Sequence, residues 1–118
     1  MVVRPSKGRT ARVSLNLRPD IDKLLENEAR RRGMSKIDVI ESIILEWAYR
    51  NGHNKILHVN FRGNTITIWD FLLNQTVDLI FSEKDGELFC TYCKTNNCGH
   101  VFAASKLPEV RKKVRIDV

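Results

Sequence analysis

The chain has 118 residues, of which 42% are hydrophobic and 29% are charged, and this composition excludes a disordered or collagen-like protein. The sequence contains no run near the roughly 18 apolar residues of a membrane-spanning helix, and its N-terminal residues lack the apolar core of a secretion signal. We therefore expect a cytoplasmic protein without a membrane partner. A chain this short buries only about two-thirds of its surface, so dimerisation or a bound metal is expected to add stability.

Positive charge gathers at the N-terminus. The chain has 20 Lys and Arg residues against 14 Asp and Glu residues, which gives a net charge of +6. Residues 1–18 contain no acid, and their basic residues are Arg4, Lys7, Arg9, Arg12 and Arg18. Such a segment either binds a polyanion, most often nucleic acid, or is a solvated tail. We expect residues 1–10 to form a flexible basic arm.

The first predicted elements are a strand and a helix. Polar and apolar side chains alternate over residues 12–17, and this period of two predicts a strand with one wet and one buried face. Pro19 suits the first position of a helix. Apolar residues then recur at helical spacing until Gly33, which predicts the helix end. The arginines of the last turn, residues 30–32, are interpreted as a solvated helix end, where the helix dipole favours positive charge. Contact with a nucleic-acid backbone is the alternative.

A second helix is predicted directly after the first. Ser35 is a suitable N-cap, with Asp38 three residues further on, and the helix is expected to end near Asn51. Its broad apolar stripe consists of Ile37, Ile40, Ile43, Ile44, Trp47 and Ala48. One strand and one short helix are too small to cover this stripe, so residues 11–53 are predicted to dimerise.

The rest of the chain, residues 54–118, predicts a small antiparallel sheet followed by a metal-binding segment. Short strands are expected over residues 56–61, 64–72, 76–81 and 87–90. Leu72 and Leu73 fit a helix as well as a strand. A short helix is expected from His100 to Ser105, and the predicted fold class of the whole chain is α+β.

A compact cluster of metal-ligand residues lies near the end of the chain. The pattern C-x2-C-x4-C-x-H is formed by Cys90, Cys93, Cys98 and His100. Three thiolates and one imidazole complete the tetrahedral coordination of a structural Zn2+, whereas catalytic zinc keeps a position open for water. The alternative is that these cysteines bind no metal and are buried in the core as small apolar residues, as cysteine pairs often are. The sequence also lacks the P-loop, HExxH and nucleophile-elbow motifs, so we expect a structural zinc site and no enzyme activity. His53 and His58 lack such neighbours and are predicted to be ordinary loop or strand residues.

The order strand, helix, Gly-x-Ser turn, helix over residues 12–47 resembles the ribbon-helix-helix family of DNA-binding proteins, the Arc, MetJ and CopG type. The segments that carry the resemblance are Arg12-Val13-Ser14-Leu15-Asn16-Leu17-Arg18-Pro19, Arg32-Gly33-Met34-Ser35-Lys36 and Ile44-Leu45-Glu46-Trp47. In that family two chains pair their strands antiparallel, and the two-stranded ribbon enters the major groove of double-stranded DNA. The resemblance implies a homodimeric, sequence-specific DNA-binding protein that regulates transcription.

The same resemblance implies which residues contact DNA. Arginine binds guanine, asparagine binds adenine and serine binds either kind of base. The predicted base-reading residues are therefore Arg12, Ser14 and Asn16. Ser35 and Lys36 lie at the start of the second helix, where free backbone amides and the helix dipole attract a phosphate. Arg9 of the basic arm is predicted to contact phosphate as well.

The C-terminal segment carries a second resemblance. The stretch Cys98-Gly99-His100-Val101-Phe102-Ala103-Ala104 resembles the Cys-x-His-x-x-Ala corner of SWIM-type zinc modules, although two residues rather than one separate the first two cysteines. More broadly, residues 88–110 resemble the zinc-binding C-terminal ends of archaeal and archaeal-virus proteins that begin with a ribbon-helix-helix unit. The resemblance implies an archaeal or archaeal-virus protein with a structural zinc ion.

Two other functions stay open at this point. An antitoxin-like or virus-encoded adaptor would use its C-terminal zinc module to bind a protein partner. An RNA-binding or nuclease-associated zinc protein would bind single-stranded RNA in place of duplex DNA.

Overall fold

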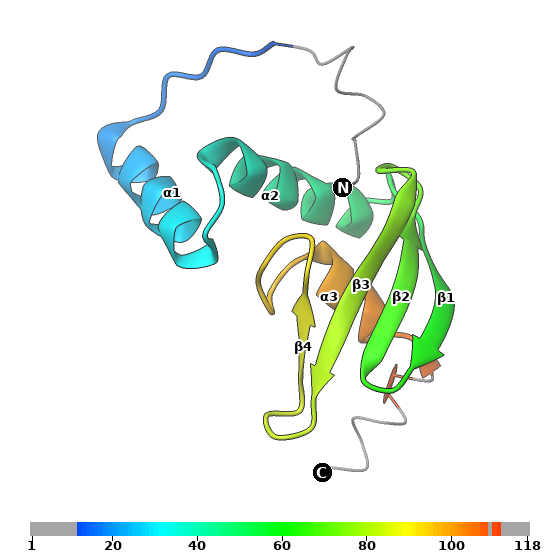
Figure 1. The fold of residues 1–118 in the computed structure, drawn as a ribbon. Coiled ribbons are helices and arrows are strands. Elements are labelled where there is room, and N and C mark those ends of the chain that lie inside the picture. The colour runs from blue at the N-terminus through cyan, green and yellow to red at the C-terminus, as the bar shows by residue number, and fades with distance from the viewer. Residues whose placement is uncertain (1–11, 109, 112–118) are drawn as a thin grey trace.

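The computed structural model describes residues 12–108, 110 and 111 (Figure 1). The elements in chain order are α1 (Pro19–Arg32), α2 (Lys36–Arg50), β1 (Ile56–Arg62), β2 (Thr65–Asp70), β3 (Gln75–Ser82), β4 (Glu87–Cys90) and α3 (Gly99–Ala104). The predicted mixture of helices with a four-stranded antiparallel sheet is confirmed. Among the described helices, none combines the length and the apolar character needed to cross a membrane.

A tight corner joins α1 to α2. Gly33 has a left-handed backbone (φ 69°) that ends α1, and the N–H groups of Gly33 and Met34 donate to carbonyls of the last turn at 3.3 and 3.0 Å. Two residues later the Ser35 hydroxyl accepts from the backbone N–H of Asp38 at 3.1 Å, as predicted for an N-cap. These local interactions set the direction in which α2 leaves the corner.

The four strands form a meander in which each strand pairs with the next in the sequence. The strand-like runs and the turn residues between them predicted these strands to within one or two residues at each end. Residues 71–74 form a turn, with a left-handed backbone at Asn74 (φ 58°). Leu72 and Leu73 therefore belong neither to a strand nor to a helix.

The core lies on one face of the sheet. Its buried residues include Ile66 and Ile68 of β2, Leu79 and Phe81 of β3, and Leu88 of β4. Helix α3 covers this face and lies between the sheet and α2 (Figure 1). The three cysteines are members of the same buried cluster, so the predicted metal ligands are part of the core that joins the sheet to the helices.

Residues 12–18, ahead of α1, have neither helical nor strand structure within the single chain, and all are exposed (Figure 1). The strand expected over residues 12–17 is therefore not formed within one copy. A strand needs a neighbouring strand to satisfy its backbone N–H and C=O groups, and the sequence-based prediction places that neighbour in a second chain. The predicted basic arm, residues 1–10, lies outside the described residues, and so does Arg9.

Candidate metal centre

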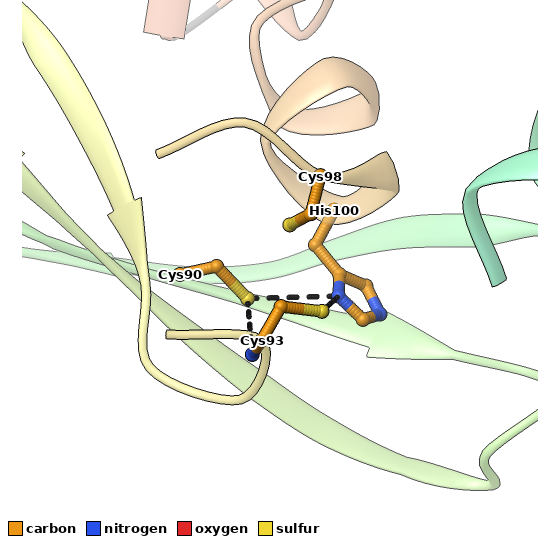
Figure 2. Close-up of side chains that lie close together, drawn as sticks. All are labelled: Cys90, Cys93, Cys98 and His100. Carbon is orange, nitrogen blue, oxygen red and sulfur yellow. Dashed lines mark hydrogen bonds between the residues drawn. The ribbon is translucent and has the colours of Figure 1, made fainter. Parts of the chain in front are cut away.

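Two elements bring the four predicted metal ligands together. Cys90 ends β4, and Cys93 lies in the turn that follows, where Lys94 adopts a left-handed backbone (φ 56°). The N–H of Lys94 donates to the carbonyl of Cys90 at 2.8 Å, which closes this turn. Cys98 is the N-cap of α3 and His100 lies in its first turn, so their side chains face the turn from the opposite side (Figure 2).

The distances between the ligand atoms fit a metal-centred tetrahedron. The three Sγ atoms and the histidine nitrogen all lie within 4.8 Å of one another, and all four residues are buried. Nδ1 of His100 is 3.6 Å from Sγ of Cys90 and 3.5 Å from Sγ of Cys93. Zn–S bonds of about 2.3 Å and Zn–N bonds of about 2.0 Å at tetrahedral angles separate sulfur from nitrogen by about 3.5 Å. The arrangement is therefore compatible with a zinc site.

The electrostatics of the cluster favour a cation. Hydrogen bonds from the Cys90 and Cys93 thiols hold the pKa of Cys98 far below its usual value, while the neighbouring sulfurs and burial hold that of Cys90 far above it. Burial alone would lower the pKa of His100, but hydrogen bonds to Asp70 and the sulfurs raise it to about 11. Without a metal ion these shifts favour a thiolate at Cys98 and a thiol at Cys90. Binding through all three sulfurs would require three buried thiolates, whose negative charge the metal ion itself would compensate.

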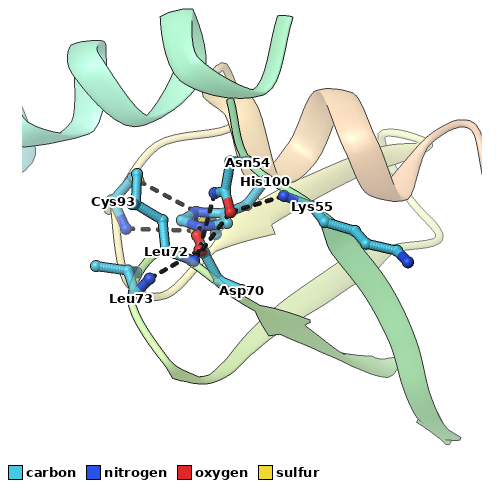
Figure 3. Close-up of polar contacts among 8 residues, drawn as sticks. Asn54, Lys55, Asp70, Leu72, Leu73, Cys93 and His100 are labelled. Carbon is cyan, nitrogen blue, oxygen red and sulfur yellow. Dashed lines mark hydrogen bonds and ion pairs between the residues drawn. The ribbon is translucent and has the colours of Figure 1, made fainter. Parts of the chain in front are cut away.

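A buried carboxylate orients the histidine. Oδ2 of Asp70 accepts from Nε2 of His100 at 2.6 Å, which leaves Nδ1 directed at the sulfurs (Figure 3). Oδ1 of Asp70 accepts from the Asn54 side chain at 2.8 Å and from the N–H groups of Leu72 and Leu73 at 2.9 and 3.0 Å. Burial opposes ionisation of Asp70, yet these hydrogen bonds lower its pKa. Carboxylate–histidine–metal arrangements of this kind fix the histidine ring and raise its basicity.

Asp70 was not among the residues singled out from the sequence, although a signal was present. The period of two along β2 places Asp70 on the same face as Ile66 and Ile68, and that face is buried. An acid on the apolar face of a strand needs a buried partner. The sequence did not reveal that the partner is a histidine thirty residues away.

Replacing Asp70 by asparagine is expected to weaken metal affinity by about 10- to 100-fold, because outer ligand partners have effects of this size. The asparagine keeps the shape of the side chain but removes the charge that faces His100. Competition against a chromophoric chelator measures the change. Asp78→Asn is the matched control, because Asp78 is an exposed residue of β3 that accepts from Thr67 at 2.7 Å. Equal affinities for the two variants would contradict the role of Asp70.

The predicted DNA-contact residues lie around the start of α2 and the segment before α1. Asn16 and Lys36 line one hollow of about 460 Å3, together with apolar residues of both segments. Arg12 and Ser14 are exposed but are not part of its lining. The Ser35 hydroxyl caps α2, and Nζ of Lys36 is paired with Asp22 at 2.8 Å. The structure therefore brings together two of these five residues in one hollow.

Two other interpretations are tested by side-chain packing. His53 stacks on Trp47 with ring centres 5.1 Å apart, and within the described residues neither His53 nor His58 belongs to the metal-ligand cluster. The interpretation of the α1 end as solvated is wrong for Arg32, whose side chain is only 8% exposed. This arginine reaches the carbonyl of Cys93, a contact that the sequence pattern did not indicate.

The described residues thus form a buried Cys3His centre that an α+β fold positions and a carboxylate orients. Comparison of the chain with protein-family models, with curated proteins and with solved structures finds no match.

Proposed function

We propose that two copies of this chain pair residues 12–17 into a ribbon that binds double-stranded DNA in a sequence-specific way, with Zn2+ in the Cys3His centre as a structural ion. The observation that carries this proposal is the apolar surface that a single chain leaves uncovered between residues 13 and 47. Its exposed side chains are Val13, Leu15, Leu17, Ile21, Leu24, Ile37, Ile43, Ile44 and Trp47.

Helix α2 is apolar on two faces. One face is buried within the chain, where α2 packs against α1 and α3; its buried residues are Val39, Ser42, Leu45 and Ala48. A second stripe, which includes Ile37, Ile44 and Trp47, stays more than half exposed. A soluble helix normally presents a polar face to water, and several large apolar side chains left exposed on one helix are typical of an interface.

A second copy of the chain is the partner that fits this surface. In the segment before α1, Val13, Leu15 and Leu17 alternate with polar residues, and all three line one hollow together with Ile37 of α2. An identical strand running antiparallel places the apolar side chains of both copies on one face, because register fixes which face each side chain occupies. A twofold axis through such a ribbon makes the interface self-complementary. We therefore infer a homodimer.

Pairing the two segments would leave one polar face of six side chains, Arg12, Ser14 and Asn16 from each copy. A two-stranded ribbon fits the major groove, and these residue types form hydrogen bonds with base edges there. The basic N-terminal segment and the net charge of +6 supply attraction to phosphate. The function that these features support best is sequence-specific DNA binding by a transcription regulator.

Selection of duplexes from a random pool tests the proposal. The metal-loaded wild-type protein is expected to enrich one sequence with twofold symmetry. Arg12→Ala is expected to cost about 1–3 kcal/mol of binding and to relax the preference at one position of each half-site. Arg62→Ala removes the same charge from an exposed position at the end of β1 and is expected to keep the full preference. A wild-type protein that enriches no duplex, or an Arg12→Ala protein with unchanged preference, would overturn the proposal.

Removing the carboxylate of Asp22 is expected to strengthen binding to all duplexes several-fold without changing the sequence preference. Asp22 holds the ammonium group of Lys36 at 2.8 Å and raises the pKa of that lysine, so it competes with a DNA phosphate for the same charge. Conversely, Lys36→Ala is expected to weaken binding to every sequence and to lower the slope of log affinity against log salt by about 0.9. Fluorescence anisotropy at several salt concentrations measures both effects. Asp22→Asn is compared with Asp85→Asn, a neutralised turn residue, and equal affinities would exclude the competition.

An adaptor that binds another protein is the second candidate. The face of the sheet opposite to the core exposes Leu57, Ile80 and Phe89, and Ile80 and Phe89 are paired neighbours on β3 and β4. An apolar patch on an open sheet face favours a protein partner. An adaptor without DNA-binding activity would enrich no sequence in the duplex selection.

A further inference from the structure

The guanidinium group of Arg32 joins the helical pair to the metal-binding loop. Its Nε lies 2.6 Å from Oε2 of Glu28 on the same helix, and its Nη1 donates to the Ser42 hydroxyl of α2 at 3.1 Å. The same Nη1 donates to the carbonyl of Cys93 at 3.4 Å. Hydrogen bonds from Arg31, and from Arg32 against the opposing effect of burial, lower the pKa of Glu28 to about 2. One buried cation therefore has partners on α1, on α2 and on a metal ligand.

A second contact ties α3 to α2. Gly99 lies so close to α2 that a Cβ atom on it would be 2.7 Å from the Cα of Glu46, a separation that a side chain cannot adopt. Further along α3, the Phe102 ring has the Arg50 guanidinium 4.0 Å from its centre and the Tyr49 ring against its edge. Gly99 lies between the two C-terminal metal ligands in the sequence. The part of α3 that holds the metal therefore rests directly on the backbone of α2.

A bound metal ion would hold the two sides of these contacts together. Backbone hydrogen bonds from Lys94 to Cys90 and from Cys90 to Thr95 close the loop that carries Cys93. A metal ion would tie this loop to α3, with two ligands on each side. Without that link, the Cys93 carbonyl would be held less firmly opposite Arg32, and α3 less firmly against α2. Helix α2 begins at the predicted phosphate-contact residues Ser35 and Lys36 and also carries the proposed dimer face. A change in the contacts that hold α2 in place would therefore change DNA binding.

We propose that Arg32 and Gly99 couple the metal centre to the helical pair, so that a bound metal ion holds α1 and α2 in the arrangement that binds DNA. This coupling rests on the proposed function. Coupling between two sites is reciprocal, so DNA binding also increases the affinity for the metal by the same factor. Arg32 acts here as a positioning residue, because its guanidinium group contacts the backbone carbonyl of Cys93 and not a metal-ligating atom.

The test compares Arg32→Ala with Arg30→Ala. Both variants lose one positive charge from the last turn of α1, but the Arg30 side chain is 71% exposed, and its partners among the described residues, Glu26 and Asn27, lie on its own helix. The probe is the duplex enriched by the metal-loaded wild-type protein, and each protein is measured with Zn2+ and after chelation. Wild type and Arg30→Ala are expected to lose about tenfold or more in affinity on chelation, within the range of about 5- to 150-fold for coupled sites. Zinc-loaded Arg32→Ala is expected to bind as weakly as chelated wild type.

Two further variants separate the coupling from a general loss of folding. Arg32→Lys keeps the charge but loses the forked geometry that reaches two acceptors. Its chelation factor, which is the fold loss of DNA affinity on removal of zinc, is expected to be smaller than that of the wild-type protein. Gly99→Ala keeps every metal ligand but pushes α3 away from Glu46, and it is expected to retain one zinc ion per chain while binding DNA weakly. Zinc content measured by a colorimetric chelator confirms that both variants are loaded.

A readout without DNA distinguishes failure of the coupling from failure of the proposed function. In the wild-type protein, chelation is expected to speed hydrogen exchange at the amides of α1 and α2. In Arg32→Ala the same amides are expected to exchange rapidly even when zinc is bound. Equal DNA affinity and equal exchange in loaded and chelated wild type would overturn the coupling. A chelation factor for Arg32→Ala equal to that of Arg30→Ala would overturn the role of Arg32. If no form binds a duplex but exchange responds as expected, the proposed function fails and the mechanical link between metal and helices stands.

Discussion

Replacing Cys98 by serine, or His100 by alanine, is expected to unfold the C-terminal half of the chain. Structural zinc ions contribute apparent binding free energies of about 10–16 kcal/mol in small zinc-binding modules, whereas the total stability of a domain is about 5–15 kcal/mol. The three cysteines are also part of the buried core of the sheet. Circular dichroism during thermal unfolding, together with the zinc content, measures the loss, and chelation of the wild-type protein is expected to reproduce it.

His53→Ala is the matched control for the histidine ligand. His53 stacks on Trp47 and lies outside the metal-ligand cluster, so its loss is expected to leave both the zinc content and the unfolding of the C-terminal half unchanged. If the wild-type protein purifies without metal and its unfolding temperature does not respond to chelation, the assignment of a structural metal centre is wrong.

Replacing Ile44 by glutamate is expected to convert the proposed dimer into single chains and to abolish DNA binding. Ile44 is 54% exposed in the single chain, so the substitution has little effect on the fold of one copy. In a dimer the same position is covered by the partner, and an unpaired charge buried there costs about 3–5 kcal/mol. Sedimentation equilibrium at micromolar concentration measures the change in mass.

Ile80→Glu provides the comparison. Ile80 is 45% exposed on the outer face of the sheet, away from the helices, and the same substitution there is expected to leave both the dimer and DNA binding intact. A wild-type protein that sediments as a single chain at high concentration would exclude the homodimer, and a loss of dimer in both variants would place the interface elsewhere.

The sequence predicted those parts of the fold that depend on neighbouring residues. Gly33 ends α1, Ser35 caps α2, and short strand-like runs separated by turn residues form β1 to β4, because each of these features is decided within a few residues. The strand expected over residues 12–17 is different. Its hydrogen-bond partner is expected to belong to another molecule, so it stays a prediction that the single chain does not test.

In the candidate site, too, the sequence predicted the residues that are close together in the chain and missed those that come from distant elements. The four metal ligands are close in the sequence, and their spacing was enough to bring them together as predicted. Asp70 and Arg32 approach the site from elements that lie 30 and 61 residues from their partners. Contacts of that kind depend on how the sheet and the helices pack. The pattern of one segment therefore did not reveal them.

Helix α3 packs against both halves of the chain, so cutting the chain between the helical pair and the sheet would remove contacts from both fragments. The sequence suggested a boundary between residues 53 and 54, but Gly99 abuts the backbone of α2 while Ala104 belongs to the core of the sheet. Cutting the chain at this boundary would expose the covered side of α2 on one fragment and an unsupported α3 on the other. Fragments made to assign a separate task to each half would then adhere to one another, or to unrelated proteins, through surfaces that the intact chain never presents to solvent.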